Sequence, residues 1–97
     1  MTLNFKRIYF KRNIKLDNLK AMLEKNININ LIIEFEEPVD IHKAQLDFLN
    51  LFLEKSKKSL VVISSNLDFE EHNFSIAPSF QEAKDIIEIE EIERLIS

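Results

Sequence analysis

Four carboxylates close together in the sequence have the types and spacing that come nearest to a reaction or metal site. They are Glu34, Glu36, Glu37 and Asp40, and they follow the most apolar stretch of the chain. If that stretch is a strand, they lie at its carboxyl end, where open parallel sheets bind ligands, and Glu34 and Glu36 share one face. Two such carboxylates could hold a divalent cation, but no glycine loop accompanies them. We therefore favour a solvated acidic edge over a metal site.

The two histidines give little support to a hydrolytic centre. His42 and His72 lie far apart in the sequence, whereas a catalytic zinc needs three protein ligands and an open position. We expect His42 to be a partly buried structural residue and His72 to be solvated. The chain has no cysteine and no glycine, which excludes thiolate sites and glycine-rich phosphate loops. We predict no enzymatic activity and no cofactor.

Charge is distributed unevenly along the chain. The net charge is −4, yet residues 1–25 are predominantly basic and residues 68–97 are strongly acidic. A basic first strand could contact RNA, and its cations are Lys6, Arg7, Lys11 and Arg12. Because the overall charge would repel phosphate, we expect basic and acidic elements to attract each other within the fold instead. We therefore do not expect nucleic acid as a partner.

Hydrophobic periodicity predicts the elements that position these residues. Apolar alternation indicates strands at 3–12, 27–35, 60–63 and 74–77, and steps of three or four residues indicate helices at 16–23, 40–57 and from 80 onward. The order β-α-β-α-β-β-α predicts an α/β fold with a mainly parallel four-stranded sheet, in one domain over residues 1–97. Alternation in the first strand shifts at Lys6 and Arg7, where we expect a bulge or bend. Asp40 is expected to cap the second helix.

The second helix has a wider apolar arc than one buried face requires. At about 100° per residue the arc covers roughly 220°, and its surplus flank is Leu46, Leu49 and Leu53. This flank either packs under a neighbouring helix or meets another chain. Both alternatives stay open from the sequence.

The final helix has a clear start and two apolar faces. Ser79 and Glu82 fit a capping box, in which each side chain bonds a free N–H at the helix start. Phe80, Ala83 and Ile87 share one face, whereas a second apolar set lies nearly opposite: Ile89, Ile92 and Ile96. We expect a bend near Glu88, or a protruding arm over residues 88–97 that docks elsewhere.

The layout resembles a STAS domain, the fold of anti-sigma-factor antagonists. Residues 31–35 (L-I-I-E-F) stand where that family has a V-V-L-D-L strand, and residues 74–83 resemble its closing strand and S-x-x-E-A helix start. In the phosphorylated members a D-S-[SA]-G segment opens the second helix. Here the matching segment is D-I-H-K at residues 40–43, without a hydroxyl group. The resemblance therefore implies a STAS-like module without the phosphorylatable serine.

The tail carries a more extensive resemblance. Residues 78–94 are similar to a group of short bacterial STAS-like proteins that often carry the label "ribonuclease Z". That nuclease uses two zinc ions held in part by an H-x-H-x-D-H motif, which is absent from this sequence. An association with the nuclease in RNA processing is the alternative function that the label implies.

These patterns together predict a non-enzymatic protein–protein interaction module that binds another protein or itself as a homodimer. The expected interaction surface comprises Leu46, Leu49, Leu53, Ile89, Ile92 and Ile96. No apolar run approaches the ~20 residues that span a bilayer and no signal peptide opens the chain, so we expect no membrane contact and a cytoplasmic location.

Overall fold

A four-stranded parallel sheet lies between two layers of helices. The computed structural model describes residues 4–37, 41–64 and 73–96. Its elements are β1 (Phe5–Phe10), α1 (Leu16–Glu24), β2 (Asn30–Phe35), α2 (Lys43–Lys55), β3 (Leu60–Ile63), β4 (Ser75–Ala77) and α3 (Phe80–Ile96). Neighbouring strands pair in parallel in the order β1-β2-β3-β4. The predicted α/β class and element order are confirmed.

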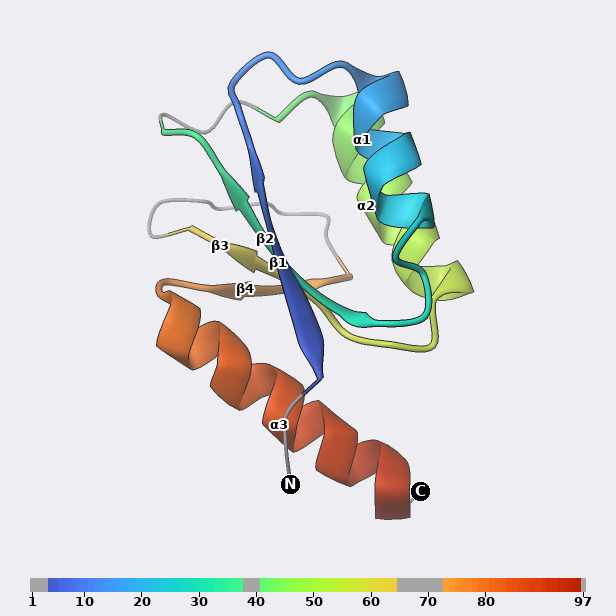
Figure 1. The fold of residues 1–97 in the computed structure, drawn as a ribbon, viewed down its shortest axis with the longest axis vertical. Coiled ribbons are helices and arrows are strands. Elements are labelled where there is room, and N and C mark those ends of the chain that lie inside the picture. The colour runs from blue at the N-terminus through green and yellow to red at the C-terminus, as the bar shows by residue number, and fades with distance from the viewer. Residues whose placement is uncertain (1–3, 38–40, 65–72, 97) are drawn as a thin grey trace.

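The helices cover opposite faces of this sheet. Figure 1 shows α1 and α2 packed together on one side, with α3 running across the other side. Leu31 and Ile33 of β2 belong to the core cluster beneath α1 and α2, whereas Ile32 belongs to the cluster beneath α3. A strand covered on both faces is apolar at nearly every position, which explains the L-I-I run.

The apolar residues of β1 change from one face of the strand to the other because β1, like β2, is covered by helices on both faces. Phe5 points to the α3 side, where its ring meets that of Phe80 edge to face at a centroid distance of 5.7 Å. Ile8 and Phe10 are buried in the opposite cluster. Pairing with β2 is continuous from Phe5 to Phe10, so the expected bulge is wrong. The first residue of β1 packs on the α3 side of the sheet, and the end of the strand packs on the α1 and α2 side.

Helix starts follow capping rules, with one change from the sequence prediction. α2 begins at Lys43, and the backbone N–H of its N-cap residue His42 donates to Gln45 Oε1 at 3.1 Å. His42 is exposed, so its expected partial burial is wrong. Asp40, the predicted cap, lies outside the described residues. At α3 the backbone N–H of Glu82 donates to Ser79 Oγ at 3.2 Å, which confirms that half of the predicted capping box.

A helix that spans a membrane needs about 20 consecutive, mostly apolar residues. In the described part of the chain, no helix is both long enough and apolar enough to cross a membrane.

Candidate functional site

The second half of α3 is bonded to the sheet through one buried amide. Asn30, at the start of β2, is 2% exposed. Its Nδ2 donates to Glu91 Oε1 at 2.6 Å and to the Asn4 carbonyl at 2.8 Å, and its Oδ1 accepts from the Ser59 backbone N–H at 2.9 Å. These bonds engage three of the four hydrogen-bonding sites of the amide, and one of the partners lies on α3.

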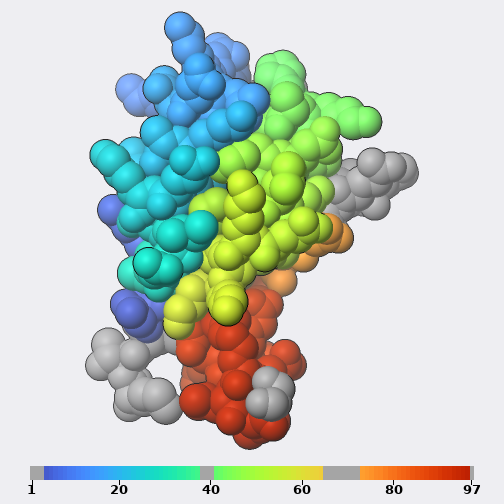
Figure 2. Space-filling view, turned by 90° about the vertical axis from the view of Figure 1, so that its right-hand side faces the viewer, coloured from blue at the N-terminus to red at the C-terminus, as the bar shows by residue number. Residues whose placement is uncertain are grey.

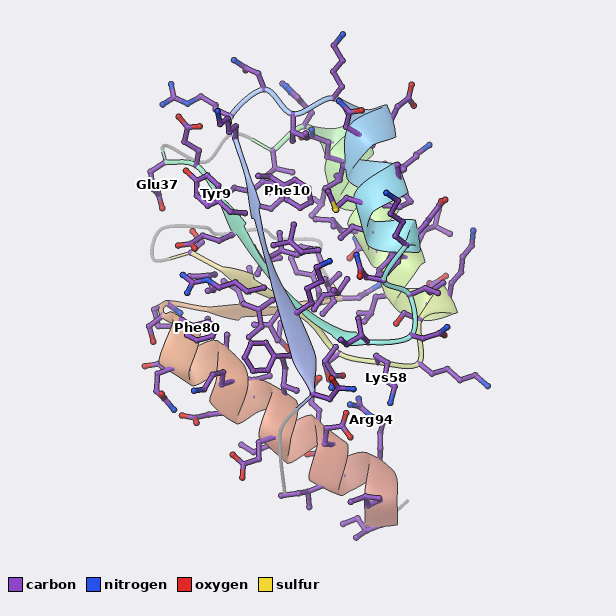
Figure 3. The ribbon with its side chains drawn as sticks, viewed as in Figure 1. Tyr9, Phe10, Glu37, Lys58, Phe80 and Arg94 are labelled. Atoms are coloured by element: carbon purple, nitrogen blue, oxygen red, sulfur yellow. The ribbon has the colours of Figure 1, made fainter. Side chains whose placement is uncertain are left out.

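Arg94 makes a second connection beside Asn30. Its guanidinium donates to Ser59 Oγ at 3.1 Å, to Asn30 Oδ1 at 3.2 Å and to Glu91 Oε1 at 2.9 Å. Figure 3 shows the Arg94 side chain leaving α3 on the side of the sheet, near Lys58. The hydrogen bond from Asn30, and then that from Arg94, lowers the pKa of Glu91 below its ordinary value.

These contacts decide the path of the final helix. α3 is one continuous helix from Phe80 to Ile96, and Glu91 and Arg94 lie within the segment that was expected to protrude. The first half is held by Ala83 and Ile87, which are both fully buried. The described part of the predicted arm is therefore docked on the molecule's own sheet. This docking fixes which face of the helix points outward.

The outward face of α3 is apolar in its second half. Ile89 is 56% exposed, Ile92 51%, Leu95 71% and Ile96 81%. At 100° per residue, the three isoleucines fall within an arc of about 60° on the side away from Ile87. We refer to these four residues as the α3 stripe. It contains all three residues of the predicted surface that come from the final helix, together with Leu95, which the sequence prediction missed.

The α2 part of the predicted surface has a different position. Leu49 is fully buried, and Leu46 and Leu53 are partly buried against the same core cluster. Figure 2 shows α1 and α2 side by side, so the surplus flank of α2 is covered from within the chain. Leu49 thus has no surface to offer a partner, and its assignment to an interaction surface is wrong. Leu51, on the outer side of α2, is the exposed leucine there at 52%.

Two of the four cations proposed for RNA contact are engaged within the fold. Arg7 forms an ion pair with Glu34 at 2.8 Å and stacks over the Phe80 ring at 4.3 Å. Figure 3 shows Phe80 at the start of α3, beneath the sheet. Arg12 donates to the Glu37 carbonyl at 2.9 Å, and its backbone N–H donates to Glu36 Oε2 at 3.2 Å.

Lys6 and Lys11 are the remaining two cations, and both are exposed. Arg7 and Arg12 are exposed as well, but each of them also makes a contact within the fold. The ion pair of the first strand is with Glu34 of β2, which lies outside the acidic residues 68–97, so attraction between the basic and acidic segments stays a prediction.

The carboxylates singled out in the sequence are dispersed among these contacts. Glu34 pairs with Arg7, and Glu36 accepts the Arg12 amide. Over residues 4–37, 41–64 and 73–96, no group of three or more histidine, cysteine, aspartate or glutamate side chains is placed to hold a metal ion. Asp40 and His72 lie outside those ranges. Among the surface features described above, the α3 stripe is therefore the candidate binding site.

Comparison with known proteins does not identify the chain. Neither a protein-family model, nor a curated protein, nor a solved structure gives a significant match. The STAS resemblance and the ribonuclease Z label therefore remain predictions from the sequence.

Proposed function

We propose that this chain is a non-enzymatic, STAS-like interaction module that binds another protein through the α3 stripe. The observation that carries the proposal is the exposure of four large aliphatic side chains, each more than half accessible, on one helix. Contiguous exposed apolar surface on a folded domain commonly marks a binding site. The hydrogen bonds of Glu91 and Arg94 hold the helix in place, so the stripe is presented on a rigid element.

The size of the stripe favours a transient complex. Covering the exposed part of each of its side chains contributes about 1–2 kcal/mol, or roughly 6 kcal/mol for the four. Association costs an estimated 4–15 kcal/mol of translational and rotational freedom. Apolar burial by the stripe alone therefore offsets only the lower part of that range of cost. A useful affinity requires additional contacts from the residues that surround the stripe.

The proposal can be tested by comparing two double variants of the same chemical kind. Ile89→Ser/Ile92→Ser removes the centre of the α3 stripe, whereas Met22→Ser/Leu51→Ser removes exposed apolar side chains from α1 and α2. Each protein is immobilised, and captured proteins are identified by mass spectrometry against the wild type. Thermal melts followed by circular dichroism verify that both variants are folded.

We expect specific capture by the wild type and by the α1/α2 variant, and its loss from the α3 variant. Equal capture by all three proteins would place the binding surface elsewhere. Absence of any specific capture by the wild type would contradict the proposed function itself.

A further inference from the structure

Negative charge borders the three isoleucines of the α3 stripe on both sides. Glu88 lies on one flank of the outward face and Glu93 on the other, and both side chains are exposed. Asp85, also exposed, lies in line with the isoleucines one turn before Ile89. These positions follow from the 100° rotation per residue of a continuous helix.

The two positive charges of α3 interact with other groups of the chain, although Lys84 lies one turn before Glu88 on the same flank. Arg94 donates to Ser59, Asn30 and Glu91 on the sheet side of the helix. Lys84 lies with its Nζ 5.4 Å from the centre of the Phe80 ring, close to the sheet. The two residues that flank the isoleucines therefore present carboxylates to an incoming partner.

The spacing of the isoleucines indicates that the α3 stripe fits another helix. Steps of three and four residues, from Ile89 to Ile92 to Ile96, are those of a coiled-coil seam with Ile89 and Ile96 at a and Ile92 at d. Glu88 then occupies a g position and Glu93 an e position, which are the positions that select partners by charge. Resting on the proposed function, we propose that the α3 stripe binds a basic amphipathic helix of another protein, with lysine or arginine beside its apolar face.

A second copy of this chain fits the stripe poorly. In a parallel pair, Glu88 of one copy faces Glu93 of the other, because g pairs with the following e across a coiled coil. In an antiparallel pair that stacks Ile89 on Ile92, Ile96 of each copy lies opposite Asp85 of the other. The first arrangement sets like charges together, and the second covers a carboxylate with an isoleucine. Both arguments favour a partner of opposite charge.

Two synthetic helical peptides of equal length test this inference. Both carry isoleucine and leucine at a and d, but one has lysine and the other glutamate at e and g. Binding of each labelled peptide to the full chain is measured by fluorescence anisotropy at 50 mM and 500 mM NaCl. We expect the lysine peptide to bind at least tenfold more tightly at low salt, and the difference to shrink at high salt because exposed charges are screened.

Charge-reversal variants locate the source of that preference. Glu88→Lys/Glu93→Lys should reverse it, so that the glutamate peptide binds more tightly. Glu24→Lys/Glu54→Lys changes the net charge by the same amount at exposed positions on α1 and α2, and should retain the wild-type preference. If the control variant also reverses the preference, net charge and not the border of the stripe is responsible, which overturns the inference.

A third variant separates this inference from the proposed function. Ile92→Asp should abolish binding of the lysine peptide while circular dichroism verifies the fold. If both peptides bind equally and Ile92→Asp abolishes both, the stripe is a docking surface without charge selectivity, and only the inference fails. If Ile92→Asp has no effect on either peptide, the stripe is not the docking surface and both proposals fail. If sedimentation equilibrium shows a wild-type dimer that Ile92→Asp dissociates, the occupant is a second copy and the basic-helix inference is wrong.

Discussion

Replacement of the buried amide at Asn30 should destabilise the fold more than its small side chain would suggest. In Asn30→Ala the Asn4 carbonyl, the Ser59 N–H, the Glu91 carboxylate and the Arg94 guanidinium each lose a partner. Ser59 is 3% exposed, so water cannot readily replace the bond to its N–H. Glu91 and Arg94 are about one-third exposed and can be partly rehydrated.

The exposure of each remaining partner sets the expected loss of stability in Asn30→Ala. Leaving the buried Ser59 N–H without a partner costs about 1–3 kcal/mol, and each bond whose remaining partner can be rehydrated contributes about 0.5–1 kcal/mol. The total is about 2.5–6 kcal/mol, with a central value near 4 kcal/mol. A domain of this length has a free energy of unfolding of about 5–15 kcal/mol, so the variant should remain folded but much less stable.

Urea denaturation followed by circular dichroism measures this loss. With a slope near 1–1.5 kcal/mol/M for a domain of this size, a loss near 4 kcal/mol should lower the midpoint by about 3–4 M. Asn18→Ala, an exposed position on α1, is the matched control and should change stability by less than about 0.5 kcal/mol. If Asn30→Ala costs no more than Asn18→Ala, the amide does not anchor α3 and the argument from its hydrogen bonds is refuted.

Three other changes probe the acid response, the core and one turn. Because the folded-state pKa of Glu91 lies below the value of about 4.3 expected in the unfolded chain, its stabilising contribution is present at neutral pH and is lost as the pH falls through the folded pKa. Urea titrations from pH 7 to pH 3 should therefore show a smaller acid-dependent loss in Asn30→Ala than in the wild type, and equal losses would contradict the assigned cause. Leu49→Ala should cost about 2–5 kcal/mol by opening a cavity, whereas Leu51→Ala, at a half-exposed site, should cost under about 1 kcal/mol, and similar midpoints in urea would show that Leu49 is not in the core. Asn13 has φ of 69°, so Asn13→Ala should lower the free energy of unfolding by about 1 kcal/mol while Asn13→Gly preserves it, and a thermal melt that ranks the two variants in reverse would refute the turn argument.

The element order could be predicted because its signals are local. Alternation marks the strands, and three- and four-residue steps mark the helices. The S-x-x-E pattern marks the start of α3, where the Glu82 N–H bonds Ser79 Oγ. Strands separated by helices predict parallel pairing, since each crossover returns the chain to the same end of the sheet. The start of α2 was predicted too early, with Asp40 as the cap, whereas the observed N-cap residue is His42.

The candidate surface could be predicted only in part. Periodicity identified the two opposed apolar faces of α3 and the broad face of α2. It could not tell that Leu49 is covered and Ile92 is not, because exposure depends on which neighbouring element lies against each face. Leu95 was missed because it stands at the edge of the stripe and outside its strict periodicity. Asn30 had one weak signal, a polar residue directly before the L-I-I run.

The amino-acid sequence by itself determined the α/β class, the order of the elements and the apolar faces that each helix carries, because those properties depend on residues near one another in the chain. Tertiary structure decided which of those faces are buried against other elements of the chain. Asn30 meets Glu91 and Arg94 across separations of 61 and 64 residues, and α2 lies beside α1. Contacts over such distances arise from the packing of whole elements. For that reason the outward face of α3 became apparent only once the helix was docked on the sheet.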